Sequence, residues 1–201
     1  LYYTDDERAD DAIDRFVQVY PESNRSARLL RDIAERQIEQ GLLDEAIGRM
    51  DTALKYPQSY NDRAELYFRL GEVSVENQDY DLARAYYLAL SDEHRRSVWS
   101  PQALFARGRL FLEEERYSDA TDAFELLRER HPQNPMTRRI GTALGESYYQ
   151  QRKFHEAIDA FNEALPHLDE ENRTKTYYLI AESYNALNNY AEATQYYREY
   201  L

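Results

Sequence analysis

The sequence predicts an all-α fold built from repeated helix pairs, and three observations lead to this prediction. First, an alanine recurs at intervals of 34, 37, 37, 37 and 36 residues. The recurring alanines are Ala12, Ala46, Ala83, Ala120, Ala157 and Ala193. Second, large apolar side chains follow each alanine at helical spacing. Third, the 201 residues include only 6 glycines and 6 prolines, which favours long helices over β-hairpins.

The repeat contains further columns that predict how two helices pack. The residues four after each alanine are Phe16, Met50, Tyr87, Phe124, Phe161 and Tyr197. The residues seven after it are Val19, Ala53, Leu90, Leu127, Ala164 and Tyr200. An i, i+4, i+7 stripe predicts the buried face of a helix. Twelve before the alanine stand the small residues Ala34, Gly71, Gly108, Gly145 and Ala181. A small side chain lets a neighbouring helix approach closely, whereas a bulky one would overpack the contact.

Together these columns resemble the tetratricopeptide repeat, whose signature runs from an aromatic residue or Leu through Leu-Gly, Tyr, Ala and Phe to Pro. The matching residues are Tyr67, Leu70, Gly71, Ala83 and Tyr87, then Leu104, Gly108, Phe111, Ala120, Phe124 and Pro132, then Leu144, Gly145, Tyr148, Ala157 and Phe161. Gly141 and Gln37 depart from columns that are usually bulky, and Arg107 replaces a Leu. The resemblance implies a right-handed α-solenoid of antiparallel helix-turn-helix repeats.

The element boundaries follow from the register of the alanine. We expect helix pairs at 27–40 with 43–56, 64–77 with 80–95, 101–114 with 117–131, 138–151 with 154–168, and 174–187 with 190–201. The corresponding repeats span 27–60, 61–100, 101–137, 138–173 and 174–201, the last of them truncated, all within one solenoid domain. Residues 1–26 supply the second helix of a truncated repeat, with a helix from Asp11 to Val19. We therefore expect the chain to come from a longer array.

Prolines mark the predicted helix ends. Pro57, Pro101, Pro132 and Pro135 are expected between helices, where a missing N–H donor costs little, and Pro166 is expected to end its helix early. Trp99 is expected to pin the linker before Pro101 to the helices.

Composition excludes several classes of function. The chain has 38 acidic and 25 basic residues, a net charge of -13, which opposes nucleic-acid binding. No apolar run is long enough to insert into a membrane. The absence of cysteine excludes disulfides, zinc–cysteine sites and a thiol nucleophile. His94, His131, His155 and His167 belong to different repeats, and there is no Gly-rich phosphate loop. We expect no enzyme activity, no metal and no cofactor.

By resemblance, the first helices of the pairs line a concave groove that binds a protein or peptide. Fifteen before each alanine lie Arg31, Phe68, Phe105, Thr142 and Tyr178. Eleven before it lie Glu35, Glu72, Arg109, Glu146 and Glu182. Eight before it lie Ile38, Val75, Leu112, Tyr149 and Asn185. Arg28, Gln102, Arg139 and Lys175 would flank them. The Lys and Asn residues with which chaperone-binding relatives hold a carboxylate tail are missing.

The residue types in the groove columns favour a ligand with basic and apolar side chains, although the acidic residues are also typical of a solvated helix face. Phe68, Phe105, Tyr149 and Tyr178 are candidate partner contacts, and the alternative that they pack between adjacent repeats stays open. A second candidate contact is the aromatic last helix with Tyr196, Tyr197, Tyr200 and Leu201, through which the chain could associate with itself.

The leading hypothesis is therefore a protein-interaction adaptor within a multiprotein complex. The alternatives are a regulatory or export-scaffold segment of a larger secretion or signalling protein, and a self-assembling array. Periods of 36 to 37 residues with tyrosine-rich first helices are similar to repeats of bacterial envelope-assembly lipoproteins and periplasmic cell-division coordinators. This similarity slightly favours the cell envelope over the cytoplasm, while the compartment itself stays open.

Overall fold

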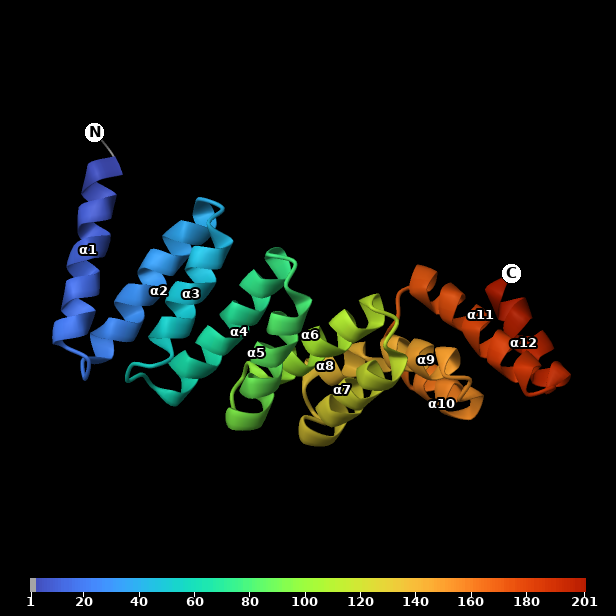
Figure 1. Cartoon of the computed structure of the whole chain (residues 1–201). Coiled ribbons are helices and arrows are strands. Elements are labelled where there is room, and N and C mark those ends of the chain that lie inside the picture. The colour runs from blue at the N-terminus through green and yellow to red at the C-terminus, as the bar shows by residue number, and fades with distance from the viewer. Residues whose placement is uncertain (1–2) are drawn as a thin grey trace. The chain divides into compact units, whose positions relative to one another are not determined.

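The structure, a computed structural model, describes the backbone of residues 3–201 and the side chains from Asp10 onward, and within this range every regular element is a helix. The elements are α1 (Tyr3–Val19), α2 (Asn24–Glu39), α3 (Leu43–Ala53), α4 (Tyr60–Glu76), α5 (Tyr80–Glu93), α6 (Ser100–Glu113), α7 (Tyr117–Arg130), α8 (Pro135–Arg139), α9 (Gly141–Gln150), α10 (Phe154–Ala164), η1 (Leu165–His167), α11 (Glu170–Ala186) and α12 (Tyr190–Tyr200). Figure 1 shows them as successive helical hairpins, the arrangement of an all-α solenoid.

The chain divides into two compact units, residues 1–103 and 104–201. In unit 1, α2 packs on α3 and α4 packs on α5, while α3 contacts α4 and α1 contacts α2. Fully buried side chains from both pairs form its core, with Leu30, Ala34, Met50, Leu66 and Leu70 at the centre. Burial of such side chains stabilises each pair by roughly 1.5–3 kcal/mol per large apolar residue.

Unit 2 repeats the same arrangement. Helix α9 packs on α10 and α11 packs on α12, while α7 contacts α9 and α10 contacts α11. The part of α6 from Leu104 onward packs with α7 around the fully buried Phe124. A second cluster surrounds Phe161, which is also fully buried. Both phenylalanines belong to the column four residues after the repeat alanine, so the predicted buried stripe is confirmed at these positions.

The small-residue column lies where two helices of a pair approach most closely. A Cβ added to Gly71 would lie 2.3 Å from the ring of Tyr87, and one added to Gly145 would lie 2.5 Å from the ring of Phe161. Gly108 makes the equivalent approach to Phe124, at 2.4 Å. The sequence prediction that a small side chain permits this approach is therefore confirmed.

Each first helix ends in the same left-handed turn, five residues before the repeat alanine. The turn residues with positive φ are Gly41, Gln78, Glu115, Arg152 and Asn188. In the second of these turns the N–H of Gln78 donates to the carbonyl of Val75 at 3.0 Å, and the N–H of Asp79 donates to that of Ser74 at 2.8 Å. This Schellman-type pairing satisfies carbonyls at the helix end and reverses the chain.

The helix boundaries agree with the prediction better at one end of the repeat than at the other. All five second helices begin at the predicted residues 43, 80, 117, 154 and 190. Three first helices, α2, α4 and α11, begin earlier than predicted because polar residues cap them further upstream. In α4, for example, Ser59 accepts a hydrogen bond from the N–H of Asp62 at 3.1 Å.

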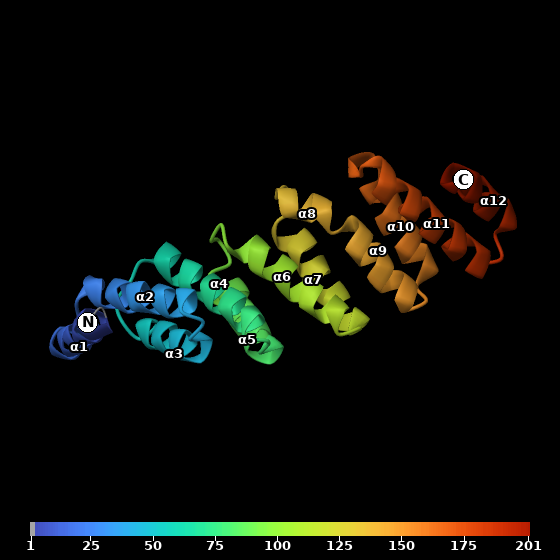
Figure 2. The same ribbon diagram turned by 90° about the horizontal axis from the view of Figure 1, so that it is seen from above.

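The single helix predicted at 138–151 is wrong, because the chain breaks there into α8 and α9 at Ile140. Figure 2 shows α8 as a short helix set off from α9. Gly141 follows the break, and a Cβ there would lie 2.7 Å from the Cβ of Ala164, so a bulky residue would not fit. Glycine in this column thus accompanies a close approach of α9 to the end of α10.

Two of the prolines do not lie where the sequence predicts. Pro101 and Pro135 lie in the first turns of α6 and α8, not between helices, because a first-turn residue needs no N–H donor. Pro166 follows the end of α10 at Ala164, as predicted.

Helix α1 is continuous from Tyr3, so the helix predicted to start at Asp11 begins earlier, and residues 1–2 lie outside the described range. In α1 the extrapolated stripe is confirmed at Phe16 but wrong at Ala12 and Val19. Ala12 is exposed and Val19 is 65% exposed, whereas Ile13, Phe16 and Val17 contact the core. The reason is that α1 packs on α2 through this neighbouring face of the helix.

Candidate protein interface

The predicted groove residues all lie on first helices of pairs, and they are described separately in each unit. In unit 1, α2 carries Arg31 and Glu35, and α4 carries Phe68 and Glu72. In unit 2, they are distributed over three helices: Phe105, Arg109 and Leu112 on α6, Glu146 and Tyr149 on α9, and Tyr178 and Glu182 on α11.

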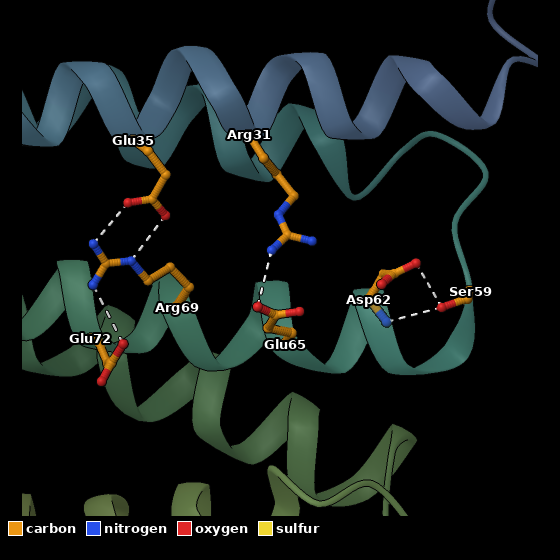
Figure 3. A network of polar contacts seen from close by, with 7 residues as sticks. All are labelled: Arg31, Glu35, Ser59, Asp62, Glu65, Arg69 and Glu72. Atoms are coloured by element: carbon orange, nitrogen blue, oxygen red, sulfur yellow. Dashed lines mark hydrogen bonds and ion pairs between the residues drawn. The ribbon is translucent and has the colours of Figure 1, made fainter.

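In unit 1 the charged groove residues are paired with residues outside the groove columns, on α4 (Figure 3). The guanidinium of Arg69 donates from Nε to Glu35 Oε1 at 3.1 Å and from Nη2 to Glu35 Oε2 at 2.9 Å, a two-pronged contact. Its third nitrogen, Nη1, lies 3.4 Å from Glu72 Oε2. Hydrogen bonding to Glu35 raises the pKa of Arg69. Arg69 is therefore already the cationic partner of both Glu35 and Glu72. The sequence did not predict this partner because Arg69 lies outside the groove columns.

A second ion pair joins the same helices. Arg31 Nη2 lies 3.4 Å from Glu65 Oε1, with both side chains partly exposed. Next to it is a cavity of about 690 Å³ between α2 and the segment that leads into α4. Its lining is mixed in charge, with Arg28, Arg31, Asp32, Glu35 and Asp62 among the residues. With two basic and three acidic residues, this lining has no strong excess of either sign with which to select a ligand.

The aromatic groove residue of unit 1 packs within the unit. The ring of Phe68 stacks on Trp99 with centroids 5.0 Å apart, and it lies 5.8 Å from the ring of Tyr87. Trp99 thereby fixes the segment between α5 and α6, as the sequence predicts. Partner contact through Phe68 stays a prediction, and the observed contacts favour the packing alternative for this residue.

In unit 2 the α6 residues are also engaged. Phe105 is half-buried, lies 6.2 Å from the ring of Phe124, and has the guanidinium of Arg139 over its face at 5.5 Å. Leu112 is half-buried against the same core. Arg109 donates to Glu113 at 3.2 Å, one turn further along α6, on an exposed face.

Aromatic and acidic side chains gather on α9, α11 and α12. Tyr178 is 41% exposed, and its ring lies 5.3 Å from that of Tyr200 and 6.3 Å from that of Tyr197. The hydroxyl of Tyr197 donates to Glu182, and this bond raises the pKa of Tyr197 to about 12. Burial raises the pKa of Tyr149, with the nearby charge of Glu182 as the second cause. We call Tyr149, Tyr178, Glu182, Tyr197 and Tyr200 the tyrosine cluster.

Glu146 lies on α9 in the same repeat column as Glu35, yet it differs from Glu35 in having no partner. Among the described residues it makes no hydrogen bond or ion pair. Its side chain is exposed, but neighbouring protein still removes part of its hydration, and this desolvation raises the pKa of the carboxyl. A carboxylate of this kind is ready to accept a cationic group.

Of the four predicted end-contact residues, two make contacts within the chain and two are exposed. Tyr196 stacks on Tyr184 at 5.6 Å and donates to Asn162 at 3.2 Å, and Tyr197 bonds to Glu182. Tyr200 is 43% exposed and Leu201 is 98% exposed. Self-association through this face stays a prediction.

Among the side chains described, from Asp10 onward, no cluster of three or more His, Asp or Glu residues is placed to hold a metal ion. None of the helices in the same range has the length and apolar character needed to cross a bilayer.

Solved structures with a similar fold come from proteins of low sequence identity. MamA of strain AMB-1 is 18% identical with a TM-score of 0.66, covering 89% of this chain and 91% of its own. A MamA fragment (residues 41 to the end) from Desulfovibrio magneticus RS-1 is 17% identical with a TM-score of 0.62, covering 87% and 92%. BtubC (BKLC) from P. vanneervenii is 15% identical with a TM-score of 0.61, covering 96% and 85%. At these identities the likeness concerns the fold alone. No match was found among curated proteins.

The family comparison agrees with the helix pairs described above. A tetratricopeptide repeat model matches residues 31–97, 95–135, 105–173 and 142–201. Repeats of this kind support a protein–protein interaction scaffold, as the resemblance implied. From the repeated columns, the recurrent turn and these matches, we conclude that the chain belongs to the tetratricopeptide repeat family.

Proposed function

We propose that this chain is a non-catalytic scaffold whose second unit binds a partner protein segment carrying basic and apolar side chains. The tyrosine cluster and Glu146 form the proposed contact surface. The observation that carries the proposal is the combination of exposed aromatic rings with carboxylates that other side chains do not neutralise.

The chemistry of this surface favours a cationic ligand. Tyrosine faces attract Lys and Arg by cation–π interaction, and a partly desolvated carboxylate adds a charge-assisted hydrogen bond. Exposed aromatic residues are also over-represented among the residues that dominate binding energy at protein interfaces. The paired carboxylates of unit 1, in contrast, offer no such site, since Arg69 already occupies them.

Selection from a phage-displayed library of random peptides tests the proposal. We expect the wild-type chain to enrich sequences that combine Lys or Arg with aromatic or aliphatic residues. Because the ring of Tyr178 is exposed, Tyr178→Ala should weaken binding of an enriched synthetic peptide by about tenfold or more while the far-UV circular dichroism stays unchanged.

A matched control distinguishes this surface from other tyrosines. Tyr80 is 40% exposed, lies on α5 in unit 1 and has no place in the proposed interface. Tyr80→Ala should leave peptide affinity unchanged. Equal losses from both variants, or enrichment of acidic peptides, would refute the proposed surface.

We also propose that this scaffold acts within a multiprotein complex, with the cell envelope as its location. The support is the similarity of the repeat period and the tyrosine-rich first helices to envelope proteins of this family. Fractionation of the source cells, followed by immunodetection of the chain, tests the location, and detection only in the cytosolic fraction would contradict it.

A further inference from the structure

A cationic cavity lies in unit 2 at the break between α8 and α9. It has a volume of about 340 Å³ and is lined by Arg138, Arg139, Thr142, Ala164, His167 and Leu168. We call it the α8 cavity. Its lining combines two guanidiniums, a hydroxyl and an imidazole, and it includes no carboxylate. An adjoining cavity of about 230 Å³ shares Arg138, Ala164 and His167 with it and is also lined by Glu163, whose carboxylate lies 3.7 Å from the guanidinium of Arg128.

The donors of the α8 cavity are free to bind a ligand. Among the described residues, neither Arg138 nor Arg139 makes an ion pair with a carboxylate, and Thr142 makes no hydrogen bond. Arg139 is held by other contacts: its guanidinium lies over the ring of Phe105, and Nη1 is 3.8 Å from Met136 Sδ. An arginine fixed by aromatic stacking loses less freedom when it binds a ligand.

The broken helix is what places these donors together. Helix α8 ends with Arg138 and Arg139, and α9 begins at Gly141, whose lack of a Cβ permits the approach of Ala164. This approach brings the end of α10 and η1, with His167, beside α8. A continuous first helix with a bulky residue in place of Gly141 would clash with Ala164.

The local charge contrasts with that of the chain. The segment from Arg130 to Gly141 contains three arginines and no Asp or Glu, in a protein with a net charge of -13. Arginines elsewhere commonly have carboxylate partners, as Arg69 and Arg128 do. For Arg138 and Arg139, in contrast, no carboxylate partner lies among the described residues.

We propose that the α8 cavity binds an oxyanion, a carboxylate or a phosphate group carried by a ligand, between the guanidiniums of Arg138 and Arg139 and the hydroxyl of Thr142. Guanidinium groups present planar, parallel N–H donors that match the oxygens of both anions. The proposal is separate from the proposed function, because it concerns α8, η1 and an anion instead of the tyrosine cluster and a cation.

A titration followed by ¹H–¹⁵N NMR tests it. Inorganic phosphate, acetate and chloride are each added to the full chain at constant ionic strength. We expect saturable shifts of the amides of Arg138, Arg139 and Thr142 with phosphate or acetate but not with chloride. The anion that saturates at the lower concentration identifies the ligand group. Similar, unsaturable shifts with all three anions would overturn the proposal.

Variants then locate the site. Arg138→Gln combined with Arg139→Gln should weaken the favoured anion by about tenfold or more, since two charge-assisted hydrogen bonds are lost. Thr142→Val, which removes only the hydroxyl, should weaken it less. Arg198→Gln removes the same charge from an exposed position on α12 and should have no effect. Equal weakening of anion binding by Arg198→Gln would mean that the affinity depends only on the total charge of the chain. This outcome would also overturn the proposal.

Discussion

What the chain leaves accessible differs between the groove positions on α2 and α4 of unit 1 and the equivalent positions on α9 and α11 of unit 2. In unit 1 Glu35 and Glu72 share Arg69, and Phe68 is stacked on Trp99. In unit 2 the residue equivalent to Glu35 in its repeat, Glu146, has no partner among the described residues, and Tyr178, equivalent to Phe68, is 41% exposed. In this chain Glu146 and Tyr178 are thus accessible to a partner, whereas Glu35 and Phe68 are engaged by other side chains.

Beneath these surfaces the two units have the same internal packing. A glycine on the first helix faces a buried aromatic ring of the second, as Gly71 faces Tyr87 in unit 1 and Gly145 faces Phe161 in unit 2. The comparison therefore separates a common core from divergent surfaces.

The largest effect is expected from alanine at the core glycines. In Gly71→Ala and Gly145→Ala the new Cβ would lie 2.3 Å and 2.5 Å from a ring carbon, so the rings must move. Overpacking of this kind costs about 1–3 kcal/mol. We expect both variants to lower the free energy of unfolding in urea denaturation by similar amounts.

The control for this pair is Gly48→Ala. Gly48 lies in the interior of α3 with nothing within 4 Å of an added Cβ, so alanine should stabilise the chain by about 0.5–1 kcal/mol. Unchanged stability of either core variant would show that the ring in that unit can move without cost. The two units would then not share the same internal packing.

A smaller, pH-dependent effect is expected from a histidine at the end of a second helix. His94 is buried between the rings of Tyr60 and Tyr67, at 4.5 Å and 5.7 Å, and burial lowers its pKa from 6.5. The unfolded chain then binds more protons than the folded one, so stability is complete above pH 6.5 and falls as the pH drops through 6.5 toward the folded pKa.

Thermal unfolding at a series of pH values measures this dependence. Glu93 and Arg63 are the charged groups that act on His94, in opposite directions. His94→Phe should flatten the decline of Tm on acidification, whereas His155→Gln, at an exposed position on α10, should not. An unchanged pH profile in His94→Phe would exclude His94 as its source. His131, in the same repeat column of unit 2, also has a pKa lowered by burial, so part of the decline should remain.

The sequence predicted the features that depend on local periodicity. The alanine column, the buried Phe124 and Phe161 and the starts of the five paired second helices follow from side chains three to seven residues apart on one helix. The left-handed turns that end the first helices are harder to predict. Gln78, Glu115 and Arg152 adopt positive φ without being residue types that favour it, so only Gly41 and Asn188 carried a local signal.

The candidate site depends on contacts between helices, and these could not be predicted. Glu35 and Arg69 are 34 residues apart, about one repeat period, and nothing in either helix alone shows that they meet. The break at Ile140 likewise accompanies a close approach of Gly141 to Ala164 on another helix, which no local pattern shows. Sequence columns predicted on which helices these residues lie, but not which of their charges are already neutralised.

A modest effect on stability is expected from the ion pair between Glu35 and Arg69 on the surface of unit 1. In a double-mutant cycle of Glu35→Gln and Arg69→Met, the coupling energy should be about 0.5–1 kcal/mol, because the contact is two-pronged but partly exposed. The exposed pair of Arg109 and Glu113 on α6 should give about 0.3–0.5 kcal/mol. Both couplings should shrink in high salt. A coupling no larger than that of the exposed pair would mean that unit 1 is not closed by this contact.

The smallest effect on stability is expected at Glu146, where the sign distinguishes the two surfaces. Desolvation raises the pKa of this carboxyl and no cation offsets it, so its charge disfavours folding above the folded pKa. Glu146→Gln should stabilise the chain slightly at neutral pH, by no more than about 0.5 kcal/mol because the side chain is exposed, and the gain should vanish as the pH falls toward 4.5. Glu35→Gln should do the opposite, since it leaves Arg69 with a weaker partner. Urea denaturation of both variants at pH values above and near 4.5 measures these signs. A loss of stability in Glu146→Gln would mean that the carboxylate already has a partner within the chain, and unit 2 would then be as closed as unit 1.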